Sequence, residues 1–223
     1  MKTMKLFMAT TAAVVFTFYA CQKQESDLPG SGQGSTSAKL ANGKISDNAE
    51  AAHVRWDIIS VDIPTTTVSP GGVAYASAIS GNIPSTLKIK LTGSGTFVAP
   101  GSGGTSGAVT GGGTWETFSG DVSTGSGTYE VTKLASWQFA NFQLPGLIDL
   151  IGNTNERSNG TAVLLIEYSD GSQGTLGIGC HGPGAPDGIE EGVIATKGYV
   201  TYWTGEVPTA TEDKNRTVFH VSQ

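Results

Sequence analysis

The chain has 223 residues, of which 32 are glycine and 14% are charged, and its formal net charge at pH 7 is −6. A chain of this length forms one or two domains, and all-β proteins of this size are commonly a single domain. The acidic balance argues against nucleic acid as a partner, because such binding depends on Lys and Arg contacts to phosphate.

Residues 1–20 have the pattern of a secretory leader. Lys2 and Lys5 precede an apolar run over residues 6–18, which is too short to span a membrane in the mature protein. The sequence Phe18-Tyr19-Ala20-Cys21 resembles the lipobox of bacterial lipoprotein precursors. That resemblance implies acylation of Cys21, a membrane contact through the lipid, and a place in the cell envelope, at the outer membrane of a Gram-negative bacterium. The alternative is ordinary secretion with a free Cys21.

Residues 21–50 are polar and rich in Ser, Gly, Gln, Asn, Lys and Asp. Such a segment cannot bury enough apolar surface to offset its ordering entropy, so we predict a disordered tether. A flexible segment of this length reaches about 30 Å from the membrane. With lipid on Cys21, Cys180 has no intramolecular partner, and the domain must be stable without a disulfide.

Alternation of apolar and polar residues predicts the first strands of an all-β domain over residues 51–223. Residues 53–63 predict a strand with one solvent-exposed side, which Pro64 ends or bends. Its apolar residues on one face are Val54, Trp56 and Ile58. Residues 73–79 predict a weaker strand. Residues 87–91 alternate apolar residues with lysines, a pattern that suits the edge of a sheet.

A five-residue phrase, Gly-x-Gly-Thr-aromatic, occurs three times, beginning at Gly93, Gly111 and Gly125. Glycine suits positive φ and close backbone approach, so each copy predicts a turn or bulge that leads into a strand. A phosphate-binding loop would need a strand before the glycines and a helix after them, and neither is predicted. Residues 99–114 are mostly Gly, Ser, Thr and Pro, and we expect a long turn or flexible loop there.

The second half of the chain continues the β pattern. Residues 128–139 predict a long strand that bends. Residues 161–168 and 174–181 predict a hairpin in the middle of a sheet. Residues 192–203 predict a last long strand, and residues 217–221 a short C-terminal one. On the last long strand, one face is expected to carry Val193, Ala195, Tyr199, Thr201 and Trp203.

The expected fold is therefore all-β, a single antiparallel β-barrel or β-sandwich of about 8–10 strands behind a disordered tether. We favour the barrel. Helix is expected at most as one turn near residues 147–151.

Cys180 and His181 are adjacent in the sequence, and a cysteine thiolate with a histidine base can form a catalytic nucleophile. Neighbours on a strand point to opposite faces, so these two side chains do not meet. Cys180 is expected in the core as an inert thiol. His181 shares its face with Gly177 and Gly179, which leave it shallow, so that another backbone, an aromatic ring or a ligand lies against it.

Residues 141–160 form a long connection that carries Leu147 among other apolar residues. Long connections often line sites, and we expect this one to fold over the open end of a barrel or over a ligand. The candidate ligand-binding residues are Gly177, Gly179, His181, Leu147 and Trp203. The tryptophans and tyrosines predict either a stacking platform for sugars or simple core packing.

Three functions stay open at this point, and we favour the first. It is a binding module for a small molecule or glycan, without a cofactor or metal, because the histidines lack ligand spacing. The second is a small barrel enzyme, an isomerase, cyclase or hydrolase, in which His181 works with Glu190 or Glu191 as base and Tyr199 or Tyr202 as acid. The third is a structural or adhesion component that uses an open sheet edge.

Overall fold

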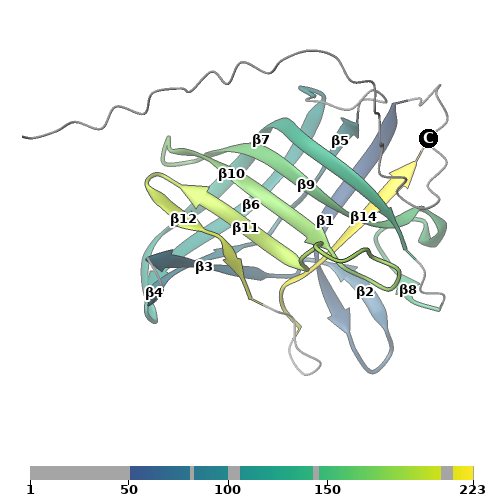
Figure 1. Cartoon of the computed structure of the whole chain (residues 1–223), viewed down its shortest axis with the longest axis horizontal. Helices are drawn as coiled ribbons and strands as arrows, with labels where there is room; N and C mark the ends of the chain where they lie inside the picture. Colours follow the sequence, from purple (N-terminus) through teal and green to yellow (C-terminus); the bar gives the residue numbers. More distant parts are fainter. Residues whose placement is uncertain (1–50, 81–82, 100–105, 143–145, 207–212, 223) are drawn as a thin grey trace, which may run out of the picture. The chain divides into compact units, whose positions relative to one another are not determined.

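The computed structural model describes residues 51–80, 83–99, 106–142, 146–206 and 213–222 (Figure 1). The predictions for the leader, Cys21 and the tether lie outside the described residues. Within the described residues, no helix is long and apolar enough to cross a membrane. Apart from the 3-10 turn η1, Thr154–Glu156, the regular structure described is β-strand, which confirms the all-β prediction.

Fourteen strands are described, and all belong to one sheet. The first seven are β1 Ala52–Asp62, β2 Thr67–Pro70, β3 Ala74–Ser80, β4 Ile83–Leu91, β5 Ser94–Ala99, β6 Val109–Ser119 and β7 Val122–Asn141. The other seven are β8 Ile148–Asp149, β9 Arg157–Tyr168, β10 Gln173–Cys180, β11 Gly192–Lys197, β12 Val200–Tyr202, β13 Thr204–Gly205 and β14 Arg216–Ser222. The count exceeds the predicted 8–10 because several of these strands are only two to four residues long.

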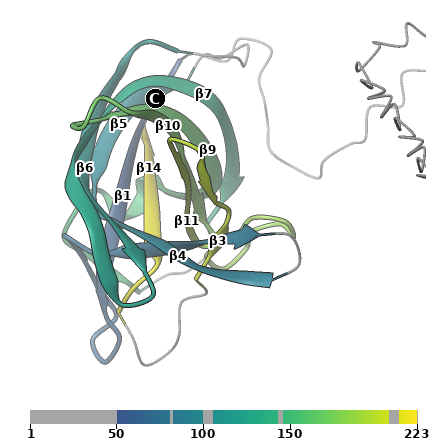
Figure 2. The same cartoon turned by 90° about the vertical axis from the view of Figure 1, so that its left-hand side faces the viewer.

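Six strands close into a ring, and each pair in it is antiparallel. The ring runs β6, β7, β9, β14, β1, β5 and back to β6. Strands β10 to β12 continue the sheet from β9, and β4, β3 and β13 continue it from β6 (Figure 2). The fold is therefore a closed barrel with extra strands rather than a sandwich. The ring itself has no open edge, and the extra strands end at β12 and β13.

The barrel interior is filled by side chains. Its largest fully buried residues include Trp56, Phe97, Tyr129, Tyr168 and Phe219. Trp137 bridges two of them, with ring centroids 5.4 Å from Phe97 and 4.6 Å from Phe219 in edge-on contacts. Edge-on aromatic pairs add about 1 kcal/mol each beyond the burial of apolar area. The described interior is thus a packed core rather than a container for a ligand.

The glycine phrases lie inside the barrel wall. Residues 111–115 are in the middle of β6 and residues 125–129 are in β7, so the predicted loop over residues 99–114 is wrong from Val109 onward. The reason is close backbone approach. A Cβ on Gly95 would lie 2.2 Å from the carbonyl oxygen of Thr110, and one on Gly113 only 1.9 Å from that of Thr92.

Other strand predictions meet mixed outcomes. Strand β7 shows two register shifts against β9, which confirms the expected bend, and the β9–β10 hairpin is present. Strand β4 is not an edge, because β3 and β6 pair with its two sides. Its lysines instead form ion pairs, Lys88 with Glu206 at 3.1 Å and Lys90 with Glu116 at 3.6 Å.

The predicted last long strand is a hairpin instead. Strands β11 and β12 pair antiparallel, and Gly198 between them has φ of 58°, which favours glycine. Lys197 pairs with Val200, so the turn reverses which residues of β12 face the core. Tyr202 is buried, whereas Trp203, predicted to share a face with Val193, is 66% exposed.

The connection between β7 and β9 covers the outside of the barrel. Strand β8 pairs in parallel with β2. Leu147 and Ile151 pack against a small apolar cluster of Ile59, Val68 and Val218, which is separate from the main core. The described part of this connection therefore lies on the outer surface of β1, β2 and β14, and Leu147 has a packing role there.

Candidate ligand-binding face

The outer surface of β9 to β12 carries the strongest candidate for a binding site. Leu164, Leu176, Ala195 and Tyr202 from these four strands are buried in the core. Because side chains alternate, the residues next to them point outward. We call the outward set the Trp203 face: Val163, Leu165, Thr175, Gly177, Ile194, Thr196, Thr201 and Trp203.

Strand register places the Trp203 face in two rows. Val163 pairs with Gly177, and Gly177 pairs with Ile194. Ala195 pairs with Tyr202, and Trp203 follows directly after the end of β12. Leu165, Thr175, Thr196 and Thr201 form the second row. Segments from four strands thus bring an indole, branched apolar groups and three hydroxyls together.

The Trp203 face is partly exposed and carries no charge on the residues that define it. Its exposed residues are Leu165, Ile194, Thr201 and Trp203. Trp203 is the most exposed of the four tryptophans, since Trp56 and Trp115 are buried and Trp137 is partly buried. Ile194, which pairs with Gly177 in the first row, is 40% exposed. An exposed indole with hydroxyl neighbours can stack on an apolar ring face and exchange hydrogen bonds with its substituents.

The glycines predicted to floor a ligand site are instead covered by the chain itself. A Cβ on Gly177 would lie 2.5 Å from Cγ1 of Ile194, and one on Gly179 would lie 1.9 Å from the carbonyl oxygen of Glu190. Both glycines are buried. A ligand on this face would therefore lie over Ile194 and Trp203 rather than in a groove along β10.

His181 lies just after β10 and is held by the loop that leads to β11. Its backbone N–H donates to Oε2 of Glu191 at 2.5 Å, and its Nδ1 lies 2.7 Å from the carbonyl oxygen of Ile189. The other oxygen of Glu191, Oε1, accepts from the backbone N–H of Thr217 at 2.7 Å. Glu191 therefore ties together the ends of β10, β11 and β14. Cys180 is buried as predicted, and burial raises its pKa.

The predicted acid–base residues do not converge. Glu190 and Tyr199 are exposed, and Tyr202 is buried. Tyr202 pairs with Ala195, whose other partner is Leu176. That level of the sheet is about 17 Å along β10 from His181 at about 3.3 Å per residue. Of the predicted set, only Glu191 contacts His181, and it does so through the backbone.

Burial raises the pKa of Glu191 to about 7, although the hydrogen bonds from His181 and Thr217 act in the opposite direction. The folded protein therefore holds a proton there that the unfolded chain has already lost, and stability falls as the pH rises from about 4.5 to 7. We expect the free energy of unfolding to be about 3 kcal/mol lower at pH 8 than at pH 4.5 from this group. Urea unfolding followed by tryptophan fluorescence across this range measures it.

The matched variants for this prediction are Glu191→Gln and Glu190→Gln. Glu191→Gln removes the titration and should flatten the pH profile, even if the lost hydrogen bond lowers stability at every pH. Glu190 is exposed, so Glu190→Gln should keep the wild-type slope. Equal slopes in wild type and Glu191→Gln would contradict the assignment.

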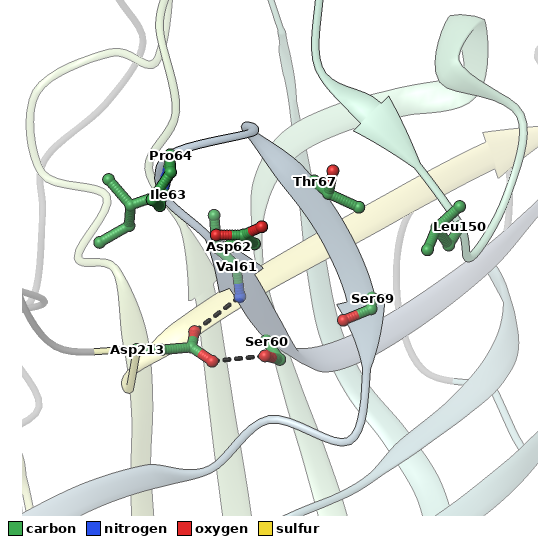
Figure 3. Close-up of a pocket in the computed structure, with 9 residues that line it drawn as sticks. All are labelled: Ser60, Val61, Asp62, Ile63, Pro64, Thr67, Ser69, Leu150 and Asp213. Carbon is green, nitrogen blue, oxygen red and sulfur yellow. Dashed lines mark hydrogen bonds between the residues drawn. The ribbon is translucent and has the colours of Figure 1, made fainter.

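An open cleft of about 470 Å³ lies beside the β1–β2 hairpin (Figure 3). Asp213 is at one side of it and accepts hydrogen bonds from the backbone N–H of Val61, at 2.6 Å, and from the hydroxyl of Ser60. Both carboxylate oxygens are thereby used to cap the end of β1. Leu150 and Ile63 are exposed at the rim. The carboxylate stabilises this hairpin, so its two hydrogen bonds have a structural role.

A buried ionic cluster, which no sequence pattern predicts, lies under the β7–β9 connection. Oδ2 of Asp149 is 2.9 Å from Nε2 of His220 and 3.6 Å from Nε of Arg157. Its Oδ1 accepts from the backbone N–H groups of Ile151 and Gly152. Burial alone would raise the pKa of Asp149, but these hydrogen bonds together lower it. The cluster anchors the connection to the barrel wall.

No protein-family model, no curated protein and no solved structure matches this chain. Within the described residues, no group of three or more His, Cys, Asp or Glu side chains is placed to hold a metal ion. The functional argument therefore depends on the geometry of the faces and clusters described above.

Proposed function

We propose that the protein is a lipid-anchored binding module of the cell envelope, whose Trp203 face binds glycan. The observation that carries this proposal is the 66% exposed indole of Trp203, which follows β12 at an uncharged surface. Folding normally buries tryptophan for its large apolar area, so an indole left exposed beside other apolar groups marks an interaction surface.

Glycan fits this surface better than other small ligands do. A sugar ring has an apolar C–H face that stacks on an indole, and its hydroxyls pair with the hydroxyls of Thr175, Thr196 and Thr201. A charged ligand would find no opposite charge among the residues of the Trp203 face. A strongly apolar ligand would favour an enclosed pocket, whereas this face is open.

The lipobox resemblance and the polar segment over residues 21–50 support the location. Acylation of Cys21 at the outer membrane would confine the domain to the envelope, where glycans are abundant and insoluble. Two or three acyl chains anchor firmly, whereas one chain gives only reversible attachment. A tether with a reach of about 30 Å would let the Trp203 face meet a fixed glycan layer.

The test is binding of the purified protein to isolated peptidoglycan and to an array of soluble glycans. Trp203→Ala is expected to weaken binding to the glycan it recognises at least about tenfold, or about 1.4 kcal/mol, because the stacking surface is lost. Trp203 emission should also shift to shorter wavelength when the glycan binds.

Tyr199→Ala is the matched control, since Tyr199 is a fully exposed aromatic residue that lies at the hairpin turn. It should bind like the wild type, and both variants should unfold within about 0.5 kcal/mol of it, as surface substitutions do. Unchanged glycan binding by Trp203→Ala, or absence of binding to every glycan tested, would overturn the proposal.

A further inference from the structure

Lys197 points inward from the end of β11 and lies against two aromatic rings. Its Nζ is 4.1 Å from the ring centroid of Trp115 and 4.7 Å from that of Tyr168. It also donates to Oγ of Ser172 at 2.8 Å and forms an ion pair with Asp170. The Lys197 side chain is only 12% exposed, so an ammonium group is held at the barrel end with little water around it.

The two rings are fixed independently of Lys197. Nε1 of Trp115 donates to the carbonyl oxygen of Thr128 at 3.0 Å, and the hydroxyl of Tyr168 donates to the backbone carbonyl oxygen of Thr196 at 2.8 Å. The ring planes meet at 81° with centroids 5.7 Å apart. Two aromatic walls near a right angle present their electron-rich surfaces to one point, which is the arrangement that recognises ammonium groups.

A carboxylate completes this site from the β9–β10 turn. Asp170 accepts hydrogen bonds from the backbone N–H and the hydroxyl of Ser172, which set its position within the turn. Hydrogen bonds from Lys197 and Ser172 lower the pKa of Asp170 to about 2, so it is ionised at neutral pH. We call Trp115, Tyr168 and Asp170 together the cation cage.

We propose that the cation cage is a binding site for organic ammonium ions, which the chain's own Lys197 occupies as an intramolecular ligand. Occupation by a tethered group corresponds to a millimolar or higher effective concentration, so a free amine competes poorly in the wild type. The contact also holds the β11–β12 hairpin against the barrel end, and this hairpin carries Trp203 on its outer side.

The test empties the cage and refills it with a free cation. Lys197→Ala removes the atoms that n-propylammonium restores, and 1-propanol is the uncharged ligand of similar size. At equal ionic strength, n-propylammonium chloride is expected to raise the Tm of Lys197→Ala by about 3 °C when it is well above its Kd, while 1-propanol is not. Wild type should show no such difference, because its cage is filled.

Lys197→Leu is the second variant, for the case in which Lys197→Ala does not fold. Leucine fills the space of the aliphatic part of the lysine side chain and thereby favours folding. Its probe is methylammonium, with methanol as the neutral control, and the same selective rise in Tm is expected. The double variant Asp170→Asn with Lys197→Leu should keep part of this response, because the rings remain. Equal effects of amine and alcohol, or complete loss of the response in the double variant, would overturn an aromatic cation site.

Discussion

Gly113→Ala is expected to destabilise the protein by about 3 kcal/mol or more. A Cβ at this position would lie 1.9 Å from the carbonyl oxygen of Thr92 and 2.6 Å from its carbon, distances at which backbone must move. Overpacking by a single methyl group typically costs about 1–3 kcal/mol, and a clash with backbone lies at the upper end because no rotamer relieves it. Urea unfolding monitored by tryptophan fluorescence measures the change.

Thr92 cannot easily move away from that methyl group. Its backbone N–H donates to the carbonyl oxygen of Thr114 at 3.1 Å, and its Oγ1 accepts from the N–H of Thr114 at 3.0 Å. Its carbonyl oxygen accepts from the hydroxyl of the buried Tyr129 at 2.8 Å. A shift of Thr92 would therefore break hydrogen bonds to β6 and β7 together, and loss of the acceptor of the buried Tyr129 hydroxyl adds about 1–3 kcal/mol.

Gly107→Ala is the matched control, since a Cβ there would meet nothing within 4 Å. Its φ lies outside the left-handed region, so alanine should change stability by less than about 1 kcal/mol, and any change should favour the folded state by restricting the unfolded chain. If Gly113→Ala lowered the free energy of unfolding by less than about 1 kcal/mol, with an unchanged m-value, the prediction would be wrong. The two strands would then move apart at little cost in free energy.

The fate of the glycine phrases shows where sequence reasoning reaches its limit. Residue alternation placed Val54, Trp56 and Ile58 on one buried face of β1, because strand periodicity is a local property. A glycine in a sequence can indicate either a turn that needs conformational freedom or a strand position where another backbone comes close. Only the pairing of β4, β5 and β6 decides which of the two applies here. Sequence reasoning took Gly111 to Thr114 as loop, although these residues are in the barrel wall.

The candidate site depended on a single turn. Lys197-Gly198 is a weak turn signal, and a straight strand over residues 192–203 puts Trp203 on the same side as Val193. The hairpin pairs Lys197 with Val200 and thereby reverses the sides of β12. One short turn therefore decides whether Trp203 belongs to the core or to the ligand face.

The buried ionic cluster could not be predicted from local sequence patterns, for a different reason. Asp149, Arg157 and His220 come from segments that meet only because β14 inserts between β1 and β9 to close the ring. Apolar alternation predicts which side of a strand is buried by the core. It does not predict that the outward side of a strand, such as the side that carries His220, is covered by a connecting segment.

Asp149→Ala is expected to destabilise the protein by about 3–5 kcal/mol, the cost of removing one partner from a buried charge cluster. The side chains of Asp149, Arg157 and His220 are at most 3% exposed, so Arg157 would keep its charge in the interior without the carboxylate. The backbone N–H groups of Ile151 and Gly152 would also lose their acceptor. Denaturant unfolding gives the total loss, and limited proteolysis of residues 146–156 reports local release of the connection.

Two further variants separate the charge from the shape of the site. Asp149→Asn keeps an acceptor for one or both N–H groups but removes the negative charge beside Arg157, so its loss should fall between wild type and Asp149→Ala. Glu116→Ala removes the partner of Lys90 in a partly exposed ion pair and should cost at most about 1 kcal/mol. If Asp149→Ala cost no more than Glu116→Ala and left the connection resistant to protease, the apolar contacts of Leu147 and Ile151 alone would hold it, and the ionic cluster would not anchor it.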